Sequence, residues 1–218
     1  MIKKIKKIIF PIAKLAFNTY HLKQRSYTYQ GIEVAISSDV FPPHFTISTK
    51  ILLDFIKPLD LENKTFLELG CGSGIIALFA ASKGADVHAT DINKIALEAL
   101  QEAAIKNELK LTVLYSDVFE ALENKDFDYI IINPPYYPKK PKNVKEQAWF
   151  CGENFEYFEK LFSQLQTHLA PNTFMILSED CEIKHIKKIA LKNNLTLTCL
   201  LKKKVAAEKN YIFNITKA

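Results

Sequence analysis

Arginine is almost absent from this sequence: Arg25 is the single arginine among 29 basic residues. The bidentate guanidinium contacts that sequence-specific nucleic-acid binders favour are therefore largely missing, although lysine can still bind phosphate without reading sequence. No stretch of about 18 consecutive apolar residues occurs, which predicts that nothing spans a membrane. The 4 cysteines form no CxxC pair and no metal-ligand spacing, so we expect reduced thiols in a cytoplasmic protein and no metal site.

The composition predicts one globular domain with a full core and a short extension, since the 218 residues are 48% hydrophobic and 24% charged. The net charge of +5 is unevenly placed along the chain. Residues 1–30 hold seven basic side chains and no acid, so the other 188 residues sum to −2. The basicity thus belongs to an N-terminal extension, which we expect to cover residues 1–39, with the main domain at residues 40–218.

The extension begins with a basic amphipathic segment, residues 1–24, whose apolar side chains follow helical spacing interrupted by Pro11. Such a segment can lie on a membrane surface, contact nucleic acid or serve a partner protein. The simplest hypothesis is a helix packed on the main domain with its lysines in solvent. Residues 25–37 then alternate around Gln30 and Gly31, which predicts a β-hairpin.

The main domain contains a glycine-rich turn in residues 66–74, FLELGCGSG. An apolar run that includes Glu68 leads into glycines at positions 70, 72 and 74, which predicts a buried strand, a sharp turn and a helix whose first amides face a ligand. The dehydrogenase fingerprint GxGxxG would need a glycine where Ile75 stands, so a dinucleotide site is disfavoured. Asp91 ends the next apolar strand, at roughly the separation where an acid reaches ribose hydroxyls. A tight turn without a ligand is the alternative.

A second motif follows a later strand. Residues 127–132, FDYIII, form a continuous apolar run typical of a central parallel strand, and Asn133-Pro134-Pro135-Tyr136 comes directly after it. Each proline keeps the preceding residue extended and donates no N–H, so the Asn133 amide oxygen and the Pro134 carbonyl can project as free acceptors. Two such acceptors can hold the hydrogens of a planar –NH2 group while Tyr136 stacks on it.

Together these motifs resemble those of the class I S-adenosylmethionine-dependent methyltransferases, and the NPPY tetrapeptide resembles that of the "methyltransferase small", HemK-like group. The resemblance covers about residues 40–218. It implies a three-layer, Rossmann-like α/β fold whose mostly parallel, seven-stranded sheet ends in an antiparallel hairpin. Two apolar runs near the end of the chain, 195–201 and 210–216, have only a short lysine-rich connection, which independently requires an antiparallel pair.

The resemblance also implies the site residues. Glu68 is expected to favour the ammonium of the cofactor's methionine part, and the glycine amides its carboxylate. Asp91 is expected to accept from the ribose hydroxyls, Ile92 to lie against adenine and Asp117 to accept from the adenine amino group, unless Asp117 only caps a helix at residues 118–122. The expected cofactor-binding residues are Thr49, Glu68, Gly70, Gly72, Gly74, Asp91, Ile92, Asp117, Val118 and Asn133. The expected catalytic residues are Asn133, Pro134 and Tyr136.

Two segments flank this site. Residues 40–55 are similar to the segment that closes over the cofactor in HemK-type enzymes, which makes Phe45, Ser48 and Thr49 candidates to touch its methionine end. Capping of the following helix explains Ser48 and Thr49 equally well. Residues 137–145, rich in lysine and proline, are expected to form an exposed, mobile loop beside the acceptor pocket, and Trp149 to wall that pocket or belong to the core.

The predicted function is S-adenosylmethionine-dependent N-methylation of a planar amide or amine in a macromolecule, with no metal. The segment before the glycine turn and the ending YIFNI look more like HemK-type protein glutamine methyltransferases, so a protein glutamine is the leading acceptor. The long helical N-terminal domain of release-factor methyltransferases has no counterpart here, which leaves the substrate open. The alternatives are an adenine-N6 or guanine-N2 methyltransferase on RNA or DNA, and a cofactor-binding interaction protein without catalysis.

Overall fold

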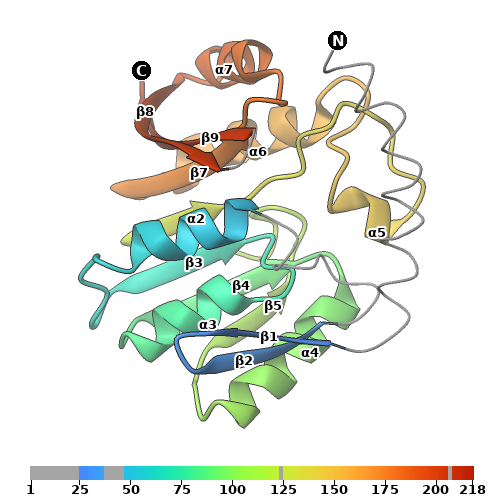
Figure 1. The fold of residues 1–218 in the computed structure, drawn as a ribbon. Helices are drawn as coiled ribbons and strands as arrows, with labels where there is room; N and C mark the ends of the chain where they lie inside the picture. Colours follow the sequence, from blue (N-terminus) through green and yellow to red (C-terminus); the bar gives the residue numbers. More distant parts are fainter. Residues whose placement is uncertain (1–24, 37–46, 123–124, 206–207) are drawn as a thin grey trace.

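A computed structural model describes residues 25–36, 47–122, 125–205 and 208–218 (Figure 1). The amphipathic segment 1–24 and Phe45 therefore lie outside the described residues. The described chain forms a seven-stranded sheet in the order β5-β4-β3-β6-β7-β9-β8 and a separate two-stranded hairpin. β5, β4, β3, β6 and β7 run parallel, whereas β9 is antiparallel to both β7 and β8. The fold predicted from the resemblance is confirmed.

The strands and helices alternate along the chain, as a parallel sheet requires. The strands of the large sheet are β3 (Thr65–Leu69), β4 (Asp86–Asp91), β5 (Thr112–Tyr115), β6 (Tyr129–Ile132), β7 (Asn172–Ser178), β8 (Leu195–Val205) and β9 (Glu208–Lys217). The helices are α2 (Ile47–Ile56), α3 (Ile75–Ser82), α4 (Lys94–Lys106), α5 (Val144–Gln147), α6 (Glu156–His168) and α7 (Ile183–Lys192). None of the helices in the described ranges has the length and apolar character to cross a membrane.

Two hydrophobic clusters cover the two faces of the sheet. Consecutive strand residues point to opposite faces, so Phe66 and Ile131 join α2, α3 and α4 on one side, whereas Leu67 and Ile130 join α6 and α7 on the other. All four side chains are fully buried. Burial on both faces explains why the central strands are continuous apolar runs in the sequence.

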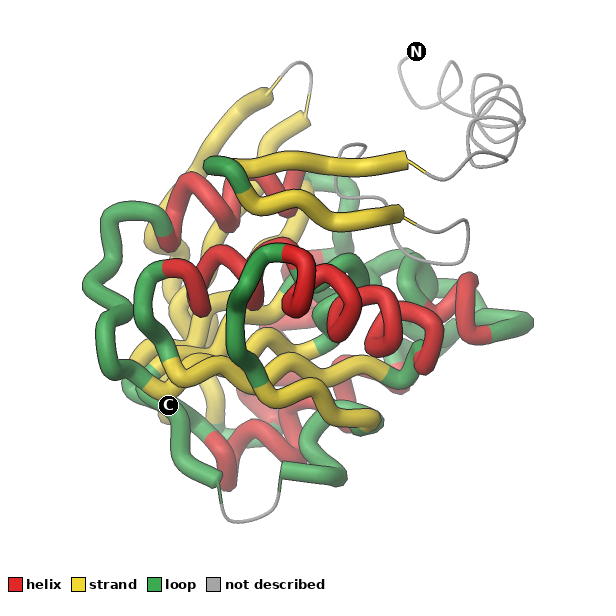
Figure 2. Tube along the Cα trace, turned by 90° about the horizontal axis from the view of Figure 1, so that it is seen from below, coloured by secondary structure: helices red, strands yellow, loops and turns green. Residues whose placement is uncertain are grey.

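The hairpin of β1 (Arg25–Tyr29) and β2 (Ile32–Ile36) lies against α3 and α4 (Figures 1 and 2). The Tyr29 ring packs edge-on against Phe79 of α3 with 5.1 Å between centroids. The Glu33 N–H donates to the Asn107 side chain at 2.9 Å, and the Asn107 amide donates back to the Glu33 carbonyl at 2.8 Å. The predicted hairpin is confirmed, and it is fastened to α3, which follows the glycine turn, and to the end of α4.

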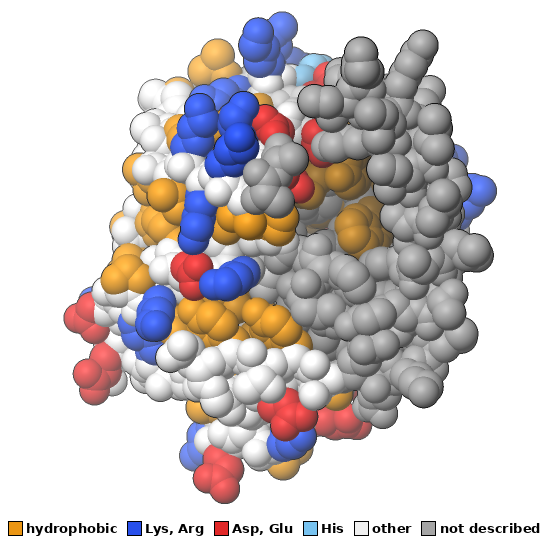
Figure 3. All heavy atoms as spheres, viewed as in Figure 1, with side chains coloured by type: hydrophobic (Ala, Val, Ile, Leu, Met, Phe, Trp, Pro, Cys, Tyr) orange, Lys and Arg blue, Asp and Glu red, His pale blue; other side chains and the backbone are white. Residues whose placement is uncertain are grey.

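The C-terminal strands are longer than the sequence predicted. We expected the lysines at 202–204 in a loop, but they lie within β8 and pair with Tyr211, Asn210 and Lys209 of β9. Lys203 reaches Asp54 of α2 at 3.2 Å, and basic side chains gather over this end of the molecule in Figure 3. β8 is an edge strand, where lysine is common because it discourages pairing with another chain.

Candidate active site

The glycine turn joins β3 to α3 as predicted. Gly70, Gly72 and Gly74 all have positive φ, at 71°, 52° and 67°, a region that glycine adopts without strain. A Cβ added to Gly74 would lie 2.3 Å from the Leu100 side chain, whereas one added to Gly70 would meet nothing within 4 Å. Gly74 therefore lets α3 pack closely on α4, while Gly70 borders open space.

The amides of this turn are partly committed to the protein itself. The Gly72 N–H donates to Asp91 Oδ2 at 2.8 Å, and the Gly74 N–H donates to the Cys71 carbonyl at 2.8 Å. The sequence predicted that these amides bind the cofactor carboxylate, but both already donate to acceptors of the protein itself. The first amides of α3, at Ile75 and Ile76, have no acceptor among the described residues and border the same open space. A helix N-terminus of this kind attracts an anion.

Glu68 caps α3 from the neighbouring strand. Gly74 stands at the N-cap position and has no side chain, and Glu68 Oε2 accepts the N–H of Ala77 at 2.7 Å instead. Glu68 is only 5% exposed. Burial raises its pKa well above the ordinary value, and Asp91 raises it further, while the bond from Ala77 opposes both. Glu68 thus holds the turn in place in addition to facing the ligand space.

We predict that wild-type protein loses stability relative to a Glu68→Gln variant as pH rises. The folded-state pKa is raised, so the stabilisation is complete below the unfolded pKa and is lost as pH rises through the folded pKa. Glutamine keeps an acceptor for Ala77 and does not titrate. Urea unfolding between about pH 4 and pH 8 should change the difference in unfolding free energy by up to about 1.4 kcal/mol per pH unit. A difference independent of pH would contradict this role.

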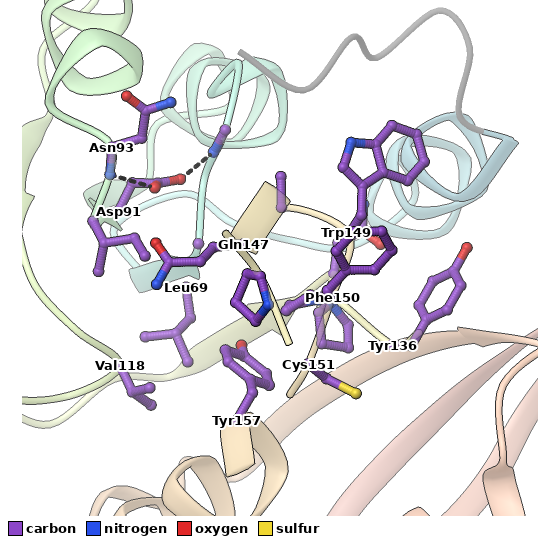
Figure 4. Close-up of a pocket in the computed structure, with 18 of the residues that line it drawn as sticks. Leu69, Asp91, Asn93, Val118, Tyr136, Gln147, Trp149, Phe150, Cys151 and Tyr157 are labelled. Atoms are coloured by element: carbon purple, nitrogen blue, oxygen red, sulfur yellow. Dashed lines mark hydrogen bonds between the residues drawn. The ribbon is translucent and has the colours of Figure 1, made fainter. Parts of the chain in front are cut away.

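Asp91 bridges the turn and the start of α4. Its Oδ2 accepts from Gly72, and its Oδ1 accepts from the Asn93 N–H at 2.8 Å (Figure 4). Burial raises the pKa of Asp91, and these backbone bonds oppose that rise. Each carboxylate oxygen has two acceptor sites, so both can still accept from ribose hydroxyls. The geometry fits the predicted role.

Asp117 and Val118 follow β5 in a strained turn. Val118 is buried with φ at 59°, which is rare for a β-branched residue and rules out the helix expected at 118–122. Ser116 holds the turn, because its hydroxyl donates to the Val118 carbonyl at 2.9 Å and accepts from Ala121 at 3.0 Å. Asp117 is half-exposed and pairs with Lys160 of α6 at 2.6 Å. The turn fixes both residues beside the ligand space.

The NPPY segment ends β6 at the centre of the sheet. Asn133 is half-buried, and in the part of the chain that the structure describes its side chain has no hydrogen-bond partner. Pro134 is buried, and the half-buried Tyr136 ring lies 4.8 Å from that of Tyr137. Burial raises the pKa of Tyr136 far above its ordinary value, so its phenol stays neutral. The amide of Asn133 is free to meet a ligand, as predicted.

One cavity of about 730 Å³ joins these motifs, a volume within the range of small-molecule sites. Every residue expected to bind cofactor or carry catalysis lines it, except Gly74, which packs on Leu100. Ser48 and Thr49 lie in the first turn of α2, which already begins at Ile47, and both line the cavity. Both residues are therefore inside the helix and not at its N-cap position, so the capping hypothesis is wrong for them.

The far wall of the cavity comes from residues after NPPY. The Tyr137 N–H donates to the Trp149 carbonyl, and the Tyr137 carbonyl accepts from the Cys151 N–H. These two bonds close the segment between Tyr137 and Trp149, which includes the predicted lysine-rich loop and α5. Trp149 and Phe150 line the cavity together with Gln147 and Tyr157 (Figure 4). Sequence reasoning considered Trp149 but missed Gln147 and Tyr157, because single polar or aromatic residues in helices carry no local signal of a site.

The comparison with protein families decides the family. The model described as methyltransferase small domain matches residues 32–178. The chain belongs to the methyltransferase small domain family. A release factor glutamine methyltransferase of Aquifex aeolicus is 30% identical to this chain over 167 residues, which is 71% of this chain and 57% of the relative. This chain spans about half the length of the curated relatives it matches.

Solved structures agree on the fold of this family member. A 16S rRNA N2 methyltransferase of T. thermophilus, in complex with AdoMet and guanosine, has a TM-score of 0.61 and 22% identity, with 88% of this chain and 50% of that chain covered. A chain of the E. cuniculi Mtq2–Trm112 complex, which is responsible for methylation of the eRF1 translation termination factor, has a TM-score of 0.63 and 21% identity, with 83% of this chain and 99% of that chain covered. At these identities, the likeness establishes a common fold.

Proposed function

We propose that this protein is an S-adenosylmethionine-dependent N-methyltransferase that modifies a planar amide or amine of a macromolecule, with a protein glutamine as the first candidate. The observation that carries this proposal is the position of Asn133. Its side chain has no partner among the described residues, and it lines the same cavity as the glycine turn and Asp91. The glutamine methyltransferase relative supports this choice of acceptor.

The cavity suits the proposed cofactor at each end. Asp91 offers acceptors to ribose hydroxyls, and the first amides of α3 offer donors to the amino-acid carboxylate. The turn leaves open space at Gly70, where a side chain would approach the ligand. When bound, S-adenosylmethionine supplies an electrophilic methyl group on a sulfonium.

The remaining chemistry belongs to NPPY. An amide or exocyclic amine nitrogen is a poor nucleophile, because its lone pair is delocalised into a carbonyl or ring. The Asn133 amide oxygen and the Pro134 carbonyl accept the two hydrogens of the –NH2 group, which turns the nitrogen toward the methyl donor. Tyr136 lies against the flat group. Orientation replaces prior deprotonation in this scheme, since the nitrogen releases a proton readily only after it is methylated.

The test is transfer of labelled methyl from S-adenosylmethionine to an extract of cells that lack this protein, followed by separate protease and nuclease digestion. We expect protease-sensitive label. The matched control is the same extract with an Asn133→Ala variant, which should leave the label near background. Label in neither fraction, with cofactor binding confirmed, would contradict a macromolecular acceptor.

A nucleobase amine is the second candidate. The aromatic side chains of Tyr136, Trp149 and Phe150 line the cavity, and base stacking on such rings is worth about 1–3 kcal/mol. Lys140 also lines it, and Lys139 lies 4.6 Å from the Phe150 ring centre, so cations border the aromatic wall. For this acceptor, nuclease-sensitive label and a steep loss of activity with added salt are expected. Activity that is indifferent to salt favours the glutamine acceptor.

We also propose that the reaction needs no metal ion and takes place in the cytoplasm, and a non-catalytic role is the alternative to be tested. The described residues contain no group of three or more His, Cys, Asp or Glu side chains arranged to hold a metal ion. Cys71, Cys151, Cys181 and Cys199 are free thiols, which suits the reducing cytoplasm that we propose as the location. A cofactor-binding partner protein without catalysis would bind S-adenosylmethionine and label no fraction of the extract.

A further inference from the structure

Tyr157 presents a fixed phenol to the cavity. It lies in the first turn of α6, lines the cavity, and in Figure 4 its hydroxyl points toward the middle of the cavity. Its N–H donates to the Cys151 carbonyl at 3.0 Å, and its ring packs edge-on against Phe158, 5.5 Å between centroids and 87° between planes. The backbone bond and the ring contact together hold the hydroxyl in one place.

This hydroxyl has no partner within the described part of the protein. Tyr157 is half-buried, and a phenol with its ring packed and its hydroxyl at the wall of a ligand site usually finds a hydrogen-bond partner. Burial raises the pKa of Tyr157, and the negative charges of Asp91 and Asp117 raise it further, so the group is a neutral O–H donor at physiological pH. A ligand that fills the cavity can supply the acceptor.

Tyr157 lies beside the turn that carries Asp117. Lys160, three residues further along α6, pairs with Asp117 at 2.6 Å, so the face of α6 that carries Tyr157 packs on this turn. Asp91 and Asp117 both line the cavity that Tyr157 lines. Ionised carboxylates only accept hydrogen bonds, so these acids can bind the hydroxyl and amino hydrogens of an adenosine but not its ring nitrogens or ribose oxygens. A donor in the same cavity is what such a ligand still needs, and Tyr157 supplies one.

We propose that Tyr157 is a cofactor-binding residue whose hydroxyl donates a hydrogen bond to the adenosine part of S-adenosylmethionine. This inference rests on the proposed function, because it takes the ligand of the cavity to be that cofactor. Tyr157 holds adenosine from the α6 side, opposite Asp91. It takes no part in the transfer of the methyl group.

The test is a Tyr157→Phe variant, which keeps the ring and its contact with Phe158. Titration calorimetry with S-adenosylhomocysteine and with 5′-methylthioadenosine, which lacks the amino-acid part, should give dissociation constants about tenfold above wild type for both ligands. The matched control is Tyr129→Phe, which removes a phenol from the opposite end of β6, outside the cavity. It should bind both ligands as wild type does, and its kcat at saturating cofactor should stay at the wild-type value, whereas Tyr157→Phe should raise the KM for the cofactor.

Three results would overturn the proposal. Wild-type affinity of Tyr157→Phe for both ligands would mean that the hydroxyl contacts neither. Weakened binding of S-adenosylhomocysteine alone would move the contact to the methionine part, and an unchanged affinity with a lower kcat would move it to the acceptor. If the wild-type protein binds neither ligand, the proposed function itself fails. If wild type and Tyr157→Phe bind both ligands equally well, only the Tyr157 inference fails.

Discussion

Asn133→Ala is expected to lower kcat for methyl transfer by about 10²–10³-fold, the loss typical of removing one preorganised polar contact at a reacting centre. The Asn133 side chain follows the central strand β6 and has no other partner in the described chain, so it is available to orient an acceptor nitrogen. Removing it leaves the –NH2 group held by one acceptor, and the nitrogen is no longer directed at the methyl donor. The backbone of β6 is untouched, and folding should be retained.

The measurement is single-turnover transfer with saturating cofactor, together with the dissociation constant of S-adenosylhomocysteine. The matched variant is Asn133→Asp, which keeps oxygen acceptors at the same position and should lose less activity than the alanine variant. Thermal unfolding controls for structure. Transfer at the wild-type rate by Asn133→Ala would mean that NPPY is not the acceptor site.

Asp91→Asn is expected to weaken S-adenosylhomocysteine binding by about 100-fold, or about 2.7 kcal/mol. Both oxygens of Asp91 accept backbone N–H groups, from Gly72 and Asn93. An asparagine has one oxygen and one –NH2 group, so one of these amides would face a donor and lose its partner. The glycine turn would then shift, and the charged acceptor proposed for ribose would be lost with it.

Calorimetric titration of the Asp91→Asn variant checks this prediction. The control is Asp86→Asn, at the exposed start of the same strand, which should bind as wild type does. A comparison of unfolding free energies separates lost binding from lost folding. Unchanged affinity in a folded Asp91→Asn variant would remove Asp91 from the cofactor site.

Much of the architecture could be predicted from local patterns. The central strands are apolar runs because both of their faces are buried, and the antiparallel ending follows from a connection too short for a crossover. Strand ends were less predictable at β8, where lysines at 202–204 look like a loop in sequence but extend an edge strand. Edge positions tolerate polar side chains, so polarity alone did not distinguish loop from strand.

The motifs that bring chemistry to the cavity were determined by the sequence itself, because a glycine turn and a proline-locked strand end depend mainly on the sterics of neighbouring residues. Their partners depend on residues far apart in the chain. Only the tertiary structure decided that Asp91 occupies the Gly72 amide and that Gly74 makes room for Leu100. It alone placed the Tyr157 hydroxyl in the cavity, since helical spacing says which face a residue shares but not what lies opposite that face.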